Sequence, residues 1–175
     1  MFKIFILSAM MALFHLPVNK SLDINLLRKE YVRAVEDADK TDSLLAVLNK
    51  VAAPEPLVIA YKGACEALRA KHAWNPYNKI SHLQQGKKTM ARAIALSPTH
   101  VEIRFLRFSL EHYLPDFLGE SRDLTEDRKT IVANIATPEN AKLGKEVLQP
   151  IAKFLIDSKR CTPAEVETLR KWLNG

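Results

Sequence analysis

The segment that most constrains the fold is residues 98–119, PTHVEIRFLRFSLEHYLPDFLG. At helical spacing it carries apolar side chains on two separate sides. One stripe contains Val101, Phe105 and Phe108, and the other contains Ile103, Leu106, Leu110 and Tyr113. A helix with this much apolar surface needs neighbours on both sides. We therefore predict that it is the central helix of an all-helical domain and that Phe105 and Phe108 are core residues.

The chain from residue 21 onward repeats its apolar residues at helical spacing, and no useful length of it alternates as a strand does. Turn residues and prolines divide it into about seven or eight helices. We expect them near residues 21–38, 42–53, 57–72, 78–96, 99–114, 121–135, from 138 onward and from 163 onward. Short connections between helices of about 12–20 residues predict antiparallel hairpins. We expect residues 21–175 to form a single all-α domain.

Local signals refine several of these boundaries. Thr99, followed three residues later by Glu102, predicts a capping box for the central helix. The polar run at residues 37–42 is expected to break the first helix, and residues 74–77, WNPY, are expected to form a loop. Small residues at 60, 63, 64, 67 and 70 predict that the helix at 57–72 lies close against a neighbour.

The first twenty residues have the pattern of a secretory signal peptide. Lys3 precedes an apolar run, Ile4 to Leu16, that is shorter than the roughly 20 residues of a membrane span. We expect cleavage between Ala12 and Ser21, and export to the periplasm or medium of a bacterium. The alternative is an uncleaved anchor or a buried first helix. No later segment has the length and apolarity of a membrane span.

Cys65 and Cys161 are the two cysteines of the chain. An oxidising compartment allows a disulfide between them, but two cysteines so far apart in sequence do not establish one. Cys65 lies among small apolar residues, which favours a buried thiol, whereas Cys161 precedes a helix start.

Charge is concentrated in the middle of the chain. Residues 57–110 contain nine basic residues and two acidic ones, a net charge of +7, while the whole chain carries +6. Such a field attracts anionic partners. We expect a protein or an anionic envelope component as the partner, and nucleic acid fits poorly with export. The alternative is an ordinary solvated surface.

Eight residues of this middle region are candidates for contact with a partner: Trp74, Tyr77, Lys79, Lys87, Lys88, Arg92, Arg104 and Arg107. Lys88 and Arg92 are four residues apart and share one side of a helix. Trp74 and Tyr77 either mark a recognition surface or plug the end of the helix pair, and we favour the plug.

Arg104 and Arg107 lie on the most apolar helix, so their guanidinium groups need acidic partners. Pairing inside the protein, with Glu102, Glu111 or Glu66, is one interpretation, and we favour it. Clamping an external anion is the other.

Motifs of catalysis and metal binding are missing from the sequence. The histidines at 72, 82, 100 and 112 have no local metal-ligand spacing, and no nucleophile elbow, phosphate loop or dinucleotide fingerprint occurs. We therefore predict no catalytic, cofactor-binding or metal-binding residue. The sequence favours a non-catalytic scaffold or binding protein of the cell envelope, with a small envelope enzyme as the alternative.

Residues 86–98, GKKTMARAIALSP, resemble the second helix of a tetratricopeptide repeat, with Gly86, Met90, Ala93 and Pro98 at the motif's offsets. The first-helix half does not match, and no second copy follows at the period of 34 residues. The resemblance implies a related helical hairpin. The leader together with AYKGACEALRAKHAWNPYNKI and VEIRFLRF is also similar to small uncharacterised exported proteins of Bacteroidetes-type bacteria, which implies a compartment but no activity.

Overall fold

The computed structural model describes residues 22–114 and 121–175, except for the side chains of residues 121 and 122. Within these ranges all regular structure is α-helical, so the predicted all-α class is confirmed. The helices are α1 (Ile24–Ala34), α2 (Ala38–Leu48), α3 (Pro56–His72), α4 (Pro76–Leu96), α5 (Val101–His112), α6 (Ser121–Asn134), α7 (Pro138–Ala141), α8 (Lys145–Asp157) and α9 (Pro163–Asn174). The predicted leader, and residues 115–119, which were expected to end the central helix, lie outside the described residues.

Capping side chains move the predicted starts of two helices, α2 and α4. The Asp37 carboxylate accepts a hydrogen bond from the Lys40 N–H at 3.1 Å, so the polar run begins α2 four residues earlier than expected. The Asn75 side chain accepts from the Tyr77 N–H at 2.8 Å, and Pro76 becomes the first residue of α4. The second half of the predicted loop at 74–77 is therefore helix, because a short polar side chain before a proline is a strong helix start.

The predicted capping box at Thr99 is wrong. His100 is the N-cap of α5, and its Nδ1 accepts a hydrogen bond from the Ile103 N–H at 3.4 Å. The helix expected from residue 138 onward is divided in two, because Gly144 takes a φ of +85°, which glycine adopts at little cost. At α9, Thr162 and Glu165 form a complete capping box.

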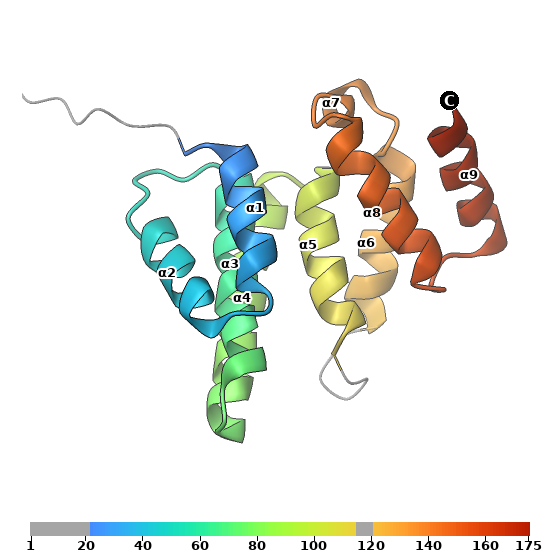
Figure 1. Ribbon diagram of the computed structural model, residues 1–175. Helices are drawn as coiled ribbons and strands as arrows, with labels where there is room; N and C mark the ends of the chain where they lie inside the picture. The colour runs from blue at the N-terminus through green and yellow to red at the C-terminus, as the bar shows by residue number, and fades with distance from the viewer. Residues whose placement is uncertain (1–21, 115–120) are drawn as a thin grey trace, which may run out of the picture.

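Helix α5 lies between two groups of helices, as Figure 1 shows with α1–α4 on one side and α6, α8 and α9 on the other. Its two apolar stripes enter two different cores. Ile103 and Leu106 belong to the first core, and Val101 and Phe108 belong to the second. The prediction that this helix needs neighbours on both sides is confirmed.

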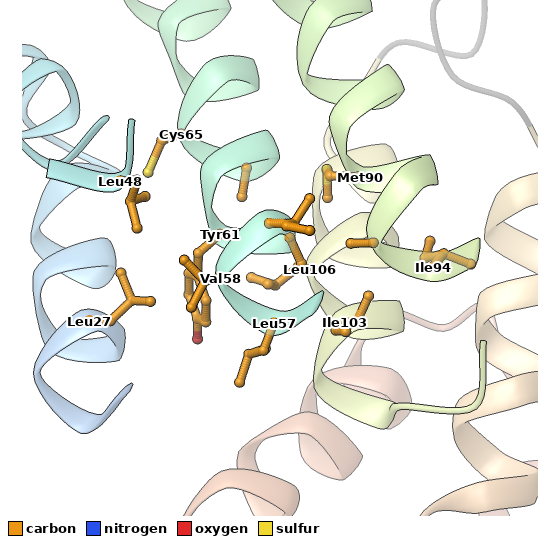
Figure 2. Close-up of a cluster of buried hydrophobic side chains, with 14 of the residues drawn as sticks. Leu27, Leu48, Leu57, Val58, Tyr61, Cys65, Met90, Ile94, Ile103 and Leu106 are labelled. Atoms are coloured by element: carbon orange, nitrogen blue, oxygen red, sulfur yellow. The ribbon is translucent and has the colours of Figure 1, made fainter. Parts of the chain in front are cut away.

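The first core contains side chains from each of the helices α1, α2, α3, α4 and α5. Figure 2 shows Tyr61 and Cys65 on the side of α3 that faces α1 and α2, with Leu106 between α3 and α4. Close approach of α3 and α4 depends on two glycines. A Cβ at Gly86 would lie 2.6 Å from the Gly63 carbonyl oxygen, and a Cβ at Gly63 would lie 2.8 Å from the Met90 amide nitrogen. The predicted tight neighbour of α3 is therefore α4.

The second core is made by α5, α6, α8 and α9, with fully buried side chains such as Phe108, Ile131 and Leu155. Phe105 is partly buried at the edge of this core, with its ring 5.2 Å from that of Phe154 in an edge-to-face arrangement. The prediction that Phe108 is a core residue is confirmed. Phe105 packs against the core without being enclosed by it.

Candidate ligand-binding groove

An apolar groove of about 760 Å³ lies between α1, α3, α4 and α5. Its apolar lining consists of Tyr31, Val35, Ala67, Leu68, Ala70, Ile80, Leu83, Phe105, Leu110, Tyr113 and Leu114. The α4 residues of this set belong to the end of the α3–α4 hairpin that extends past the neighbouring helices in Figure 1. The described helices cover this end of the hairpin incompletely, and the groove lies there.

Large apolar side chains are exposed around this end of the molecule. The exposed fraction is 98 % for Trp74, 78 % for Tyr77 and 75 % for Tyr113. The interpretation of Trp74 and Tyr77 as a plug for the helix pair is therefore wrong. Ile80 lies on the same side of α4 as the buried Leu83, but it is 46 % exposed because it borders the groove.

Three charged residues line the groove: Glu36, Lys71 and Lys79. The Lys71 ammonium donates to the Glu36 carboxylate and to the Val35 carbonyl, both at 2.9 Å. Lys79 makes no ion pair with any residue that the structure describes. The two lysines and one glutamate leave a net charge of +1 on the groove, carried by Lys79.

A smaller and more polar hollow of about 370 Å³ lies on the α2 side of the hairpin. The Arg69 guanidinium donates to Asp42 at 2.7 Å there, and the buried Nε2 atom of His72 has no hydrogen-bond partner. His82 and Trp74 complete its wall. In the described ranges no group of three or more histidine, cysteine or acidic side chains is arranged to hold a metal ion.

The two thiols lie away from the groove and are both free. Burial raises the pKa of Cys65 to about 12, and burial, with a smaller contribution from Glu165, raises the pKa of Cys161 to about 11. Thiols with such pKa values stay protonated near neutral pH and are poor nucleophiles. Cys65 belongs to the first core and Cys161 packs against the second.

The basic residues of α4 do not form one face. Lys79 and Lys88 are nine residues apart, which places them about 180° apart around the helix. Lys79 lines the groove, whereas Lys88 and Arg92 are exposed on the side away from the buried Leu83 and Met90. Lys87 is 20 % exposed and lies 3.0 Å from the Glu111 carboxylate. Of the four basic candidates on α4, Lys88 and Arg92 lie on the same side of the helix.

Arg104 and Arg107 are buried, and both pair inside the protein. The fully buried Asp127 of α6 accepts from Arg104 Nη1 at 2.9 Å, from Arg107 Nε at 2.7 Å and from Arg107 Nη2 at 2.8 Å. Glu126 accepts from Arg104 at 2.7 Å. Internal pairing was the interpretation we favoured, but its partners come from α6 rather than from Glu102, Glu111 or Glu66.

The acids that had been expected as partners take other roles. Glu102 accepts from Arg28 Nε and Nη2 at 2.8 and 2.7 Å, and from the Tyr61 hydroxyl at 2.7 Å. Glu66 accepts from the Thr89 hydroxyl, which ties α3 to α4. Each of these bonds joins different helices, so the buried acids fix the packing of the helical array.

The positive charge of residues 57–110 is largely neutralised in space. Five of its nine basic residues pair with acids from outside that stretch: Arg69, Lys71, Lys87, Arg104 and Arg107. Lys62 of α3 and Lys79, Lys88 and Arg92 of α4 keep their charge without an ion pair among the described residues. The field available to a partner is therefore smaller than the sequence suggests, and on α4 it is divided between two sides.

Several groove residues were not predicted as site residues, including Tyr31, Val35 and Leu110. Their sequence pattern is that of ordinary core positions. Only the ends of the apolar stripes extend beyond the core, at Ile80 on α4 and at Tyr113 on α5. No family model matches the chain, and no curated protein or solved structure does either. The assignment of function therefore rests on the chemistry of the groove and its surroundings.

Proposed function

We propose that the protein is an exported, non-catalytic binding protein of the cell envelope, and that its ligand site is the apolar groove between α1, α3, α4 and α5. The groove's volume of about 760 Å³ carries this proposal. Ligand sites are typically concave, mostly apolar and about 300–1,000 Å³ in volume, with a few polar groups that orient the ligand. Lys79 supplies such a group here.

Exposed aromatic residues at the mouth of the groove support the same conclusion. Tyr113 lines the groove and is three-quarters exposed, and Ile80 beside Lys79 is also exposed. Apolar side chains that gather at one end of a molecule mark a surface that contacts a partner or ligand. Trp74 and Tyr77 are also exposed, at the start of α4.

The polar groups of the groove favour binding over catalysis. The Ser109 hydroxyl donates to the Leu106 carbonyl at 3.0 Å, and Glu36 is paired with Lys71. Nucleophilic catalysis needs a nucleophile and a base within hydrogen-bond reach of each other. In the lining that the structure describes, no serine hydroxyl or thiol lies within reach of a base, and the Lys71 ammonium is held in an ion pair by Glu36. This supports a binding role rather than the alternative of a small enzyme.

The envelope location rests on the leader pattern of Lys3 and the apolar run from Ile4 to Leu16. No helix in the described part of the chain is long and apolar enough to cross a membrane. Lys88 and Arg92, on the far side of α4, attract anionic surfaces over a distance of about 8 Å at physiological salt.

Binding of a neutral solvatochromic dye such as Nile red tests the groove directly. We expect the dye to bind with blue-shifted emission and to lose at least tenfold in affinity in an Ala70→Phe variant, because the new ring fills the groove. Ala91→Phe is the matched control, since Ala91 is exposed on the outer side of α4. Equal dye binding by the wild-type protein and Ala70→Phe, with melting curves showing both folded, would sink the proposal.

A further inference from the structure

We propose that the ligand of the groove is a long-chain fatty acid, with its hydrocarbon chain inside and its carboxylate on the Lys79 ammonium. This inference rests on the proposed function of the groove and names the chemistry of the ligand. Three properties of the described residues support it: the polar satisfaction of the lining, the size of the groove and its net charge.

Apart from the Tyr31 and Tyr113 hydroxyl groups, the described lining leaves few polar groups for the middle of a ligand. Ser109 is occupied by the Leu106 carbonyl, and Lys71 is occupied by Glu36 and the Val35 carbonyl. An extended peptide would bury backbone N–H and C=O groups that need hydrogen bonds, and leaving them unpaired is costly. A hydrocarbon chain has no such groups, so it matches this lining and a strand of peptide does not.

The size of the groove argues against a docked helix. A helix is about 10–12 Å across and rises about 5.4 Å per turn. At that width, between one and two turns would fill a volume of about 760 Å³. A helix that short is unstable without a longer supporting surface. A single hydrocarbon chain fits within the same space and is flexible enough to follow the walls between Leu68, Leu83 and Leu110.

The charge of the groove matches one negative charge. Lys79 is the cation of the lining without an ion pair in the described part of the chain, and the Lys71–Glu36 ion pair adds no net charge for a second anionic group. Lys79 also lies in the first turn of α4, which contains no acidic residue. The positive end of the helix dipole therefore adds to the attraction for an anion. A carboxylate carries one charge, whereas a phosphate monoester carries nearly two.

Displacement of Nile red by three ligands with the same sixteen-carbon chain tests the proposal. Palmitate, hexadecanol and hexadecyl phosphate are compared below their micelle concentrations. We expect palmitate to bind about tenfold more tightly than hexadecanol and more tightly than hexadecyl phosphate. Lys79→Gln should remove the tenfold advantage of palmitate and leave hexadecanol unchanged. Lys88→Gln, which changes a cation on the opposite side of α4, should leave all three affinities unchanged.

Other outcomes overturn the proposal in distinguishable ways. Equal affinities for palmitate and hexadecanol, or no effect of Lys79→Gln, would show that the groove does not bind a carboxylate through Lys79. Tighter binding of hexadecyl phosphate would replace the carboxylate by a phosphate head. Dye that binds but is displaced by an acidic amphipathic peptide and by none of the three chains would leave the groove as a site for a protein helix. Dye that does not bind at all would overturn the proposed function as well.

Discussion

Helices α4 and α5 both carry cations that the sequence made candidates for binding, and the structure gives the two sets opposite environments. Arg104 and Arg107 of α5 are buried and share the Asp127 carboxylate. Lys88 and Arg92 of α4 are exposed, with no ion pair in the part of the chain that the structure describes. The same residue types thus hold the fold together on one helix and face solvent on the other.

The difference follows from the number of neighbours. Helix α5 has a core on each side, so a cation on it must be buried and must find an acid. Helix α4 packs mainly on α3 and α5, which leaves its outer side to water. Burial raises the pKa of Asp127 even though Arg107 and Arg104 lower it. Burial lowers the pKa of Arg107, but its bonds to Asp127 outweigh this and raise it overall. The ion-pair cluster of Arg104, Arg107 and Asp127 therefore fixes how α5 packs on α6, although removing these charges from water costs free energy.

The largest loss of stability is expected from disrupting this ion-pair cluster. Asp127→Ala leaves two buried guanidinium groups without their shared carboxylate, and such a loss costs about 3–5 kcal/mol of unfolding free energy. Asp123→Ala is the matched control, because Asp123 is 20 % exposed and 3.4 Å from Arg107. It should cost less than about 1 kcal/mol.

Denaturation in urea measures both variants. Similar losses of unfolding free energy for Asp127→Ala and Asp123→Ala would mean that the arginines of α5 find other partners easily. The contrast between α5 and α4 would then be one of exposure alone.

A smaller effect is expected within α5 itself. Phe108→Ala removes a fully buried ring and should cost about 3 kcal/mol of unfolding free energy. Phe105→Ala should cost roughly half as much, because Phe105 is partly buried and lines the groove. Thermal melts of the two variants compare them directly. A Phe105 variant as unstable as the Phe108 variant would place both rings equally in the core and would restore the prediction made from the sequence.

Periodicity predicted the all-α class and the two stripes of α5 correctly, because the spacing of apolar residues alone determines which side chains share a face. It failed at the ends of the stripes. Ile80 shares the apolar side of α4 with Leu83, but it belongs to the end of the α3–α4 hairpin that extends past the neighbouring helices. Spacing within one helix contains no information on how far the next helix extends, so neither the exposure of Ile80 nor the groove could be predicted.

Ion pairing shows the same limit. The sequence indicated that Arg104 and Arg107 need acids, since a buried charge is costly. It could not select Asp127, about twenty residues away, over the nearer Glu102 and Glu111, because that choice depends on the rotation of α6 against α5. The resemblance of residues 86–98 to a tetratricopeptide repeat stays a prediction.

A third effect, smaller again, concerns the start of α5. Burial lowers the pKa of His100, and its Nδ1 accepts the capping hydrogen bond from the Ile103 N–H. An imidazole with a lowered pKa stabilises the fold above about pH 6.5, the ordinary value, and this contribution is lost as the pH falls below it. His100→Asn keeps a cap that does not titrate. The wild-type protein should therefore lose stability relative to this variant as the pH falls from 7.5 to 5.

Unfolding free energies at several pH values check this expectation. The pKa of His112 is also lowered, by burial and then by Arg160, and its contribution is common to both proteins. The difference between them isolates His100. Parallel pH curves for the wild-type protein and the His100→Asn variant would mean that the cap at α5 contributes little.

The smallest effect on stability is expected on the outer side of α4. Reversing Lys88 and Arg92 to Glu should change the unfolding free energy by less than about 0.5 kcal/mol, because exposed substitutions away from packed contacts usually do. The same reversal should abolish retention on an anionic surface at low salt, since two exposed cations become two anions on one helix face. At high salt, where the Debye length falls to about 3 Å, the wild-type protein should elute as the variant does. Retention that survives both the reversal and high salt would show that the charges of Lys88 and Arg92 interact only with water and do not contact the anionic surface. The contact would then belong to the groove with Tyr113 or to the exposed aromatic residues Trp74 and Tyr77.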